Sequence, residues 1–370
     1  MRSEPRDTAS AMRTISPLSS RYPIMKPIAK YFVATAVAGL LLVGVGQAQQ
    51  APAAKTDATT TRAPSNWKVS KTPWGDPDLQ GKWPISHLMS VPLQRPKQYG
   101  ERLQFSPEEI EQQRRAIQAQ NDRYKQDEAA GRISMGHWVE ETELPVQTSL
   151  IVFPADGQLP AQTEAGRKLS AAMGSDWNRQ VFDSPADFGP WGRCITRGLP
   201  NGMLPNPYNN GIEILQSPGY VVINMEMVHE ARIVPVSKMP PLDGAVTQWL
   251  GSSRGHWEGN VLVVETTNFN GETSMTDPPT RGSPTDPRAS STQQKITERF
   301  ERVSKDQIIY TQHVSDPVTQ VSDYTVRAPW KLDENYDFYE YACHEDNTAI
   351  RNFITSSRAK RAQDAAKKQQ

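Results

Sequence analysis

The sequence lacks the signatures of the serine hydrolases and of the nucleotide-binding enzymes. It contains no Gly-x-Ser-x-Gly motif, no glycine-rich dinucleotide fingerprint and no phosphate-binding loop. Gly251-Ser252-Ser253-Arg254 contains serine, but it is better interpreted as the start of a strand. These absences argue against Ser-His-Asp chemistry and against nucleotide binding.

Long apolar runs are also scarce. The longest spans residues 31–45, and it lies between the basic residues Lys26 and Lys30 and the small-residue sequence Gly46-Gln47-Ala48. This order is typical of a secretory signal peptide. We expect residues 1–48 to be removed by cleavage after Ala48, the alternative being a retained N-terminal anchor. No later stretch approaches the ~18 apolar residues that cross a bilayer, so we expect a soluble mature chain without a membrane span.

Neither sign of charge is in excess. The chain has 41 basic and 41 acidic residues, and residues 1–48 account for six of the basic and two of the acidic ones. The mature chain therefore keeps 35 basic and 39 acidic residues, a net charge of −4. Nucleic-acid binding needs a basic face for the phosphates, so the composition argues against such a partner.

Cysteine is rare, with only Cys194 and Cys343 present. In an exported protein we expect these two to form a disulfide, which would tie the irregular segment 183–211 to the last predicted strand. Cys343 lies next to His344 in the sequence, so a reactive or metal-bound thiol is the alternative.

Composition divides the mature chain into four parts. Residues 49–72 are rich in Ala, Thr and Pro and are predicted to be a disordered linker. Residues 73–182 are predicted to form an N-terminal arm, and residues 358–370 a charged tail. Between them, 183–357 form the main β-domain, which begins with the proline- and glycine-rich segment 183–211. Long ordered loops of this kind are commonly functional.

Two helices are predicted in the N-terminal arm. Ser106, Pro107 and Glu109 supply an N-cap, a first helical residue and a capping box, which predicts a helix over 107–130. Its apolar positions are sparse, so we expect only a narrow buried stripe. A second, short helix is predicted over 162–173.

The sequence of the main domain predicts short strands joined by tight turns. Alternating apolar residues and turn signals predict nine strands, at 212–216, 220–227, 231–236, 253–257, 261–268, 294–303, 307–314, 319–328 and 338–343. Many short strands with short connections are typical of an antiparallel barrel or sandwich.

Several motifs resemble those of a family of secreted bacterial proteins to which no activity is attached. They are Arg193-Cys194, Tyr208-Asn209-Asn210, Pro218-Gly219-Tyr220-Val221-Val222-Ile223, Glu226…His229…Arg232, Ser253-Arg254-Gly255…Trp257-Glu258-Gly259, Leu262-Val263-Val264-Glu265-Thr266-Thr267-Asn268-Phe269, Glu298-Arg299-Phe300 and Tyr339-Glu340-Tyr341-Ala342-Cys343-His344-Glu345. The resemblance covers about residues 74–347 and implies a shared fold and a secreted location. Gly81-x-Trp83 is in addition similar to the first-strand signature of lipocalin-type barrels, where the tryptophan closes one end.

Ionisable residues repeatedly break the apolar alternation of residues 219–347. The breaks are Glu226, His229, Arg232, Arg254, His256, Glu258, Glu340, His344 and Glu345. A buried charge must be paired or hydrogen-bonded, so this recurrence predicts an occupied cavity. Glu226 and Arg232 are six positions apart and fall on one face of a strand, which predicts a charge pair.

Two kinds of chemistry are open to these residues. His344 or Glu340 could transfer a proton while Arg254 or Arg232 stabilises an oxyanion. Alternatively, His229, His256 and His344 with one carboxylate could hold zinc or iron. Their spacings match no compact metal motif, so no cofactor is favoured.

Other polar residues are candidate ligand contacts. The predicted ligand-binding set is Glu226, His229, His256, Glu258, Asn268, Tyr208, Asn209 and Asn210. Asn268 ends a strongly apolar strand and would lie at the mouth of a barrel, where its simplest role is to satisfy backbone groups. The aromatic residues Trp177, Trp191, Trp249, Trp257, Tyr324 and Trp330 could line an apolar pocket or could simply form the core.

We therefore expect a periplasmic or secreted all-β protein, an antiparallel meander closing into a calycin-like barrel or sandwich with an N-terminal helical arm. Its expected function is to bind a small, largely apolar molecule, aromatic or lipid-like, in a cavity. A lyase, isomerase or hydrolase that uses the same cavity is the first alternative. A structural envelope protein whose polar motifs are hydrogen-bond networks is the second.

Overall fold

The computed structural model describes residues 67–132, 139–140, 142–173, 179, 181–237, 239–240, 242–276, 280–284, 287–345 and 347–368. The predicted signal peptide (1–48), most of the predicted linker (49–72) and Trp177 lie outside these residues. No helix in the described part of the chain is both long enough and apolar enough to cross a bilayer.

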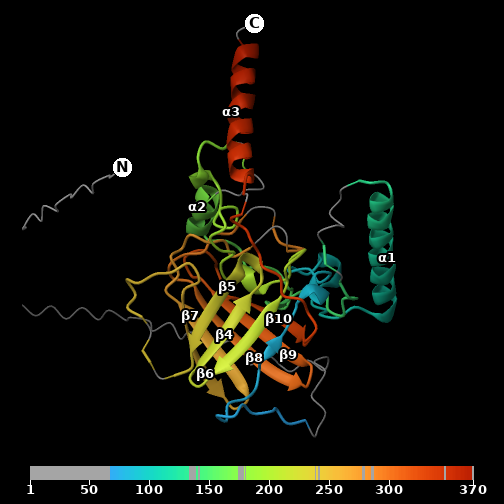
Figure 1. Cartoon of the computed structure of the whole chain (residues 1–370), viewed down its shortest axis with the longest axis vertical. Helices are drawn as coiled ribbons and strands as arrows, with labels where there is room; N and C mark the ends of the chain where they lie inside the picture. Colours follow the sequence, from blue (N-terminus) through green and yellow to red (C-terminus); the bar gives the residue numbers. More distant parts are fainter. Residues whose placement is uncertain are drawn as a thin grey trace, which may run out of the picture. The chain divides into compact units, whose positions relative to one another are not determined.

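The described chain is mostly β and forms two antiparallel sheets (Figure 1). One has the order β1-β3-β4-β5, with β1 at Gly81–Lys82, β3 at Ile212–Ser217, β4 at Tyr220–Met225 and β5 at Glu230–Pro235. The other has the order β2-β10-β9-β8-β7-β6, with β2 at Ile151–Phe153, β10 at Tyr324–Lys331, β9 at Gln307–Ser315, β8 at Lys295–Ser304, β7 at Val261–Thr267 and β6 at Ser252–Glu258. Within each sheet, apart from β1 and β2, which come from the N-terminal half, strands adjacent in the sequence are neighbours, as a meander requires.

The antiparallel, mainly β fold is thus confirmed, but no closed barrel forms within the described residues. The sheets touch along one side through a single isolated bridge between Val236 and Gly255. Near the other side, the Asp333 amide donates to the Lys82 carbonyl oxygen at 3.0 Å. These isolated contacts do not make a continuous ladder, so each sheet keeps its own edges.

The expectation of an N-terminal helical arm is not supported. Residues 73–182 supply strands to both sheets and core side chains, with Leu79, Trp83 and Leu150 fully buried. The predicted Gly81-x-Trp83 opening is part of this: Gly81 has φ +135°, and a side chain there would collide with Leu332. The apolar residues of this region belong to the common core. The region is therefore part of the β-structure and not a separate arm.

Three helices accompany the sheets: α1 (Pro107–Ala129), α2 (Glu164–Met173) and α3 (Ala349–Lys367). α1 begins with the predicted capping box, in which Ser106 and Glu109 exchange side-chain-to-backbone hydrogen bonds. None of its residues is buried, which agrees with its sparse apolar positions. α3 begins well before the predicted tail at 358–370, and Phe353 near its start contacts the rings of Phe182 and Phe188.

Two of the strand predictions need correction. The predicted strand 319–328 begins only at Tyr324, because the Asp316 carboxylate accepts hydrogen bonds from the amides of Val318 and Thr319 and holds a turn there. The predicted strand 338–343 does not form. The Tyr339 amide donates to the Glu226 carboxylate instead of to a neighbouring strand.

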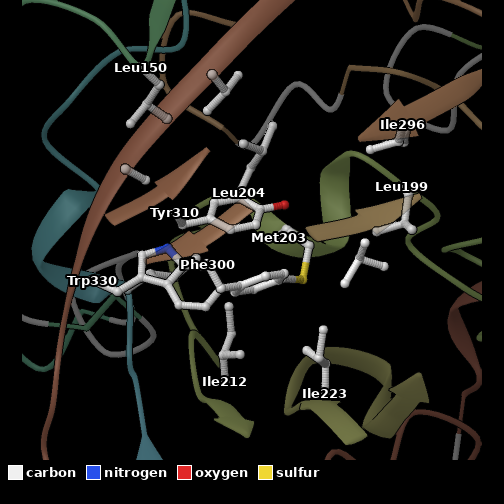
Figure 2. Close-up of a cluster of buried hydrophobic side chains, with 14 of the residues drawn as sticks. Leu150, Leu199, Met203, Leu204, Ile212, Ile223, Ile296, Phe300, Tyr310 and Trp330 are labelled. Atoms are coloured by element: carbon white, nitrogen blue, oxygen red, sulfur yellow. The ribbon is translucent and has the colours of Figure 1, made fainter. Parts of the chain in front are cut away.

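The core fills the space between the two sheets. Figure 2 shows Ile212 and Ile223 from the four-stranded sheet and the rings of Phe300, Tyr310 and Trp330 from the six-stranded one. Tyr310 stacks on Trp330 with ring centroids 4.5 Å apart, and Phe300 packs against Tyr310 at 5.1 Å. These rings occupy the interior where the sequence predicts a ligand cavity, so they are core residues.

Candidate functional site

Glu226 is a structural carboxylate in the turn between β4 and β5. It is 1 % exposed and accepts hydrogen bonds from the Asn209 side chain (3.0 Å), the Gly211 amide (2.9 Å), the Tyr336 hydroxyl (2.6 Å) and the Tyr339 amide (3.1 Å). The charge pair predicted between Glu226 and Arg232 is therefore wrong. β4 ends at Met225, so the turn carries Glu226 away from the strand face on which Arg232 lies.

Arg232 instead crosses to the other sheet. Its guanidinium forms two hydrogen bonds with the Glu298 carboxylate, one of them at 2.9 Å, and both side chains are almost completely buried. The Tyr310 hydroxyl also donates to Glu298, at 2.8 Å, and Arg232 donates to the hydroxyls of Ser253 and Thr266 at 3.2 and 3.3 Å. Burial alone would lower the pKa of Arg232, but Glu298 outweighs it and raises this pKa.

This network shows how the interior accepts charge without a ligand. A buried carboxylate that has a bidentate arginine and a tyrosine hydroxyl needs no further partner. Burial, followed by the charge of Glu298, raises the pKa of Tyr310 well above its usual value, so the phenol stays a donor. The polar breaks at Arg232 and Glu226 therefore have structural partners.

The three histidines of the metal hypothesis do not come together. Within the described residues, no three His, Cys, Asp or Glu side chains are grouped so that they could hold a metal ion. The His229 ring Nδ1 is hydrogen-bonded to the Tyr341 carbonyl oxygen at 2.8 Å. His256 lies on the outer face of β6, 3.4 Å from Glu258, and His344 lies in a turn after the disulfide.

The acid–base candidates are also spread out. Arg254 lies on the outer face of the six-stranded sheet and donates to the carbonyl oxygen of Ser253 at 2.8 Å. Arg232 comes from the four-stranded sheet and points into the space between the two sheets. Glu340 is exposed in the segment after β10. None of these residues, nor His344, lines either of the two cavities described below.

The remaining ligand candidates are divided between two loops. Asn268 donates to the carbonyl oxygens of Asp243 (2.8 Å) and Val246 (3.0 Å), the backbone role considered for it. Asn209 and Asn210 are held between Glu226 and a second carboxylate, Glu140, which accepts from the Asn210 side chain at 3.2 Å. Tyr208 precedes them in the same loop.

The disulfide prediction is confirmed: Cys194 and Cys343 are joined, with Cα atoms 5.7 Å apart. The bond fixes the segment after β10, where a last strand was predicted and does not form, against the loop 183–211. Asn347 reinforces this junction through a hydrogen bond to the Gly192 carbonyl oxygen at 3.2 Å.

A cavity that none of these candidates lines is found on the outer face of the six-stranded sheet. It lies where β10 extends beyond the end of its shorter neighbour β2. β2 has three residues and β10 has eight, so part of the β10 edge has no neighbouring strand. Side chains satisfy this edge instead: Gln147 donates to the Arg327 carbonyl oxygen at 3.2 Å, and His87 contacts the Pro329 carbonyl oxygen at 2.8 Å. Pro329 has no amide hydrogen, and it is tolerated in mid-strand because its nitrogen faces this same open edge.

The resulting cavity, which we call the β10-edge cavity, has a volume of about 250 Å³. Nine of the sixteen residues that line it are apolar: Leu88, Val91, Leu103, Leu144, Pro145, Val146, Val152, Ile309 and Pro329. The polar ones are His87, Gln104, Glu143, Gln147, Gln307, Arg327 and Lys331. An ion pair between Glu143 and Lys331 ties the segment 142–147 to β10.

His87 is a half-buried histidine in the short 3-10 helix Ser86–Leu88 at this cavity. Burial is the largest influence and lowers the pKa of His87 below its ordinary value of 6.5, and the charge of Lys331 acts in the same direction. The carbonyl oxygens of Pro329 and Pro84 and the charge of Glu143 oppose this without reversing it. The ring is therefore neutral at pH 7, and its Nε2–H donates to the Pro329 oxygen, which can only accept.

We expect His87 to make the protein less stable in mild acid. Its pKa is lower in the folded chain, so the unfolded chain binds more protons, and stability falls as the pH drops below about 6.5. His87→Gln keeps a donor for the Pro329 oxygen and cannot titrate. Urea unfolding at about pH 7.5 and about pH 5.5 should show a smaller loss of stability in acid for this variant than for the wild type.

The difference in acid-induced loss of stability between the wild type and His87→Gln reports on His87 alone. Burial raises the pKa values of Glu140 and Glu230, and these carboxyl groups are unchanged in both proteins. An equal acid loss in the wild type and in His87→Gln would contradict a lowered pKa of His87.

The sequence gives little sign of this cavity, because its walls come from segments that are far apart in the chain. His87 is a single histidine outside any motif, and the predicted strand 319–328 ends one residue before Pro329. A proline inside an otherwise regular strand was the available signal, since it marks an edge without a strand neighbour.

Comparison of the chain with protein-family models, with curated proteins and with solved structures gave no match in any of the three.

Proposed function

We propose that the protein binds a small, largely apolar molecule, and that the β10-edge cavity is the binding site. The observation that carries this proposal is a concave space of about 250 Å³ with mostly apolar walls and a few polar groups. Ligand sites of proteins have this composition, and a volume near the lower end of their range fits a compact ligand. The interior between the sheets does not offer such a space, because aromatic and aliphatic side chains fill it.

The polar groups of the cavity would orient the ligand. His87 and Gln147 are held by carbonyl oxygens of β10, so their positions are fixed before a ligand arrives. The Glu143–Lys331 ion pair lies at the segment that covers the cavity, and both side chains are about half exposed. An exposed ion pair contributes at most about 1 kcal/mol, so this cover can open without a large cost.

The proposal predicts specific changes in the methyl spectra of the protein. In a protein labelled at Ile, Leu and Val methyl groups, titration with p-cresol should shift the signals of Leu88, Val91, Leu103 and Ile309. Leu144→Trp should weaken binding at least about tenfold, ~1.4 kcal/mol, because the larger ring fills the cavity from its covering segment.

Leu169→Trp is the matched control. Leu169 is exposed on α2 and does not line the β10-edge cavity, so the same exchange there should leave binding unchanged. Shifts scattered over the surface, or equal binding by the two variants, would refute the site.

We further propose that the chain is an exported protein of the secreted family that its motifs resemble. Two observations support this: the order of basic, apolar and small residues up to Ala48, and the disulfide, which persists in an oxidising compartment. A lipocalin-like relationship is part of the same proposal. The burial of Trp83 beside Gly81 supports it.

A further inference from the structure

A second, larger hollow lies between α1 and the loops next to the sheets; we call it the α1 groove. Its volume is about 1020 Å³. The helix side is formed mainly by Gln113, Ile117, Gln120, Asn121 and Tyr124, which follow one another at helical spacing. The α1 groove and the β10-edge cavity share no lining residue, so the two can be tested separately.

The opposite wall of the α1 groove is a fixed polar surface. The Glu140 carboxylate accepts hydrogen bonds from the backbone amide and the side chain of Asn210, both at 3.2 Å. Asn206 is 4 % exposed, and its side-chain nitrogen Nδ2 donates to the Leu204 carbonyl oxygen at 3.0 Å. These contacts hold the wall in place without a ligand, as a preorganised site requires.

The helix wall is not explained by packing. α1 (teal in Figure 1) has 23 residues and none of them is buried. A helix of this length in water normally depends on packing of an apolar face for its stability. Here the face toward the groove carries three amides, one tyrosine, Lys125 and Glu128, with only Ala116 and Ile117 as apolar residues, which is a surface suited to polar ligands.

Charges in the α1 groove cancel. Lys125 and Arg281 are its basic residues, and Glu128 and Glu140 its acidic ones. Arg281 donates to the Ser90 carbonyl oxygen at 2.5 Å and is thereby held in the wall. The lining therefore has no net charge, and it offers side-chain amides that donate and accept hydrogen bonds and a carboxylate that accepts them. Hydroxyl groups can both donate and accept hydrogen bonds, so they are suited to such a lining.

We propose that the α1 groove binds a neutral, polyhydroxylated ligand, a short oligosaccharide. Its hydroxyls would bond to Gln120, Asn121 and Glu140, and a sugar ring would pack on the apolar face of Tyr124. One common mode of peptide recognition adds an extended segment to an exposed strand edge. The walls here are a helix face and irregular loops, which favours the sugar.

Calorimetric titration of the mature chain tests the proposal, with maltohexaose, cellohexaose and chitohexaose as probes. At least one of them should bind saturably. Gln120→Ala and Tyr124→Ala should each weaken that binding about tenfold, ~1.4 kcal/mol. Neither residue is buried, and alanine favours the helix, so both variants should fold.

Gln118→Ala is the matched control, because Gln118 lies on α1 but does not line the groove. It should bind as the wild type does. Absence of binding by all three sugars would overturn the proposal, as would binding that Gln120→Ala and Tyr124→Ala leave unchanged. Binding of an Ala-Gln hexapeptide without binding of any sugar would also overturn it.

Discussion

Arg232→Met is expected to lower the free energy of unfolding by about 3–5 kcal/mol, because it leaves a buried carboxylate without its cation. Glu298 is 0 % exposed, and after the exchange only the Tyr310 hydroxyl would donate to it. The loss should appear in urea unfolding as a lower midpoint with an unchanged slope, which marks a change in stability alone.

A second substitution should reverse most of this loss. Arg232→Met with Glu298→Leu removes both charges, and such replacements by apolar residues are often neutral or stabilising. The Tyr310 hydroxyl then lacks an acceptor, which costs about 1–3 kcal/mol, so recovery is complete only when Tyr310→Phe is added.

The neighbouring strand position supplies the control. Arg299 follows Glu298 and pairs with Glu258 on the outer face, where both side chains are about half exposed. Arg299→Met should change stability by no more than about 1 kcal/mol. Equal effects of Arg232→Met and Arg299→Met would mean that the Arg232–Glu298 pair is not buried.

Removal of the disulfide is expected to have the next largest effect. Cys194 and Cys343 are 149 positions apart, and a bond that closes so long a loop strongly restricts the unfolded chain. The double variant Cys194→Ser with Cys343→Ser should lose about 2–5 kcal/mol relative to the oxidised wild type. Thermal and urea unfolding of the two proteins, prepared without reductant, would measure this difference.

Treatment with a reductant separates the stability that the covalent bond contributes from the stability that packing of the sulfur atoms contributes. Dithiothreitol should bring the wild type down to the stability of the double variant, and it should not affect the double variant. Two titratable thiols in the unfolded, non-reduced wild type would contradict the disulfide.

The strands were predictable where their signals are local. The β3–β4 and β6–β7 hairpins each have a glycine with positive φ at the turn, Gly219 and Gly259, followed by a strand rich in β-branched residues. Such patterns fix strand and turn together. The start of β10 was missed because Asp316 caps its preceding turn with a side chain, a choice that hydrophobic periodicity does not report.

The partners of the ionisable residues were not predictable, because they come from distant parts of the chain. Glu298 is 66 positions from Arg232, and Tyr336 is 110 positions from Glu226. The sequence indicates correctly that these charges need partners, and it cannot show that the protein itself supplies them. The β10-edge cavity was missed for the same reason, since it arises from the unequal lengths of β2 and β10.

The most direct test of the ligand-binding account is a crystal structure of the mature chain grown with p-cresol. The account predicts one ordered molecule in the β10-edge cavity, with its ring against Ile309 and its hydroxyl within hydrogen-bond distance of His87 or Gln147. Crystals of the Leu144→Trp variant grown under the same conditions should show the indole of the new tryptophan in the cavity and no p-cresol. A cavity that contains only water at saturating p-cresol would contradict the account.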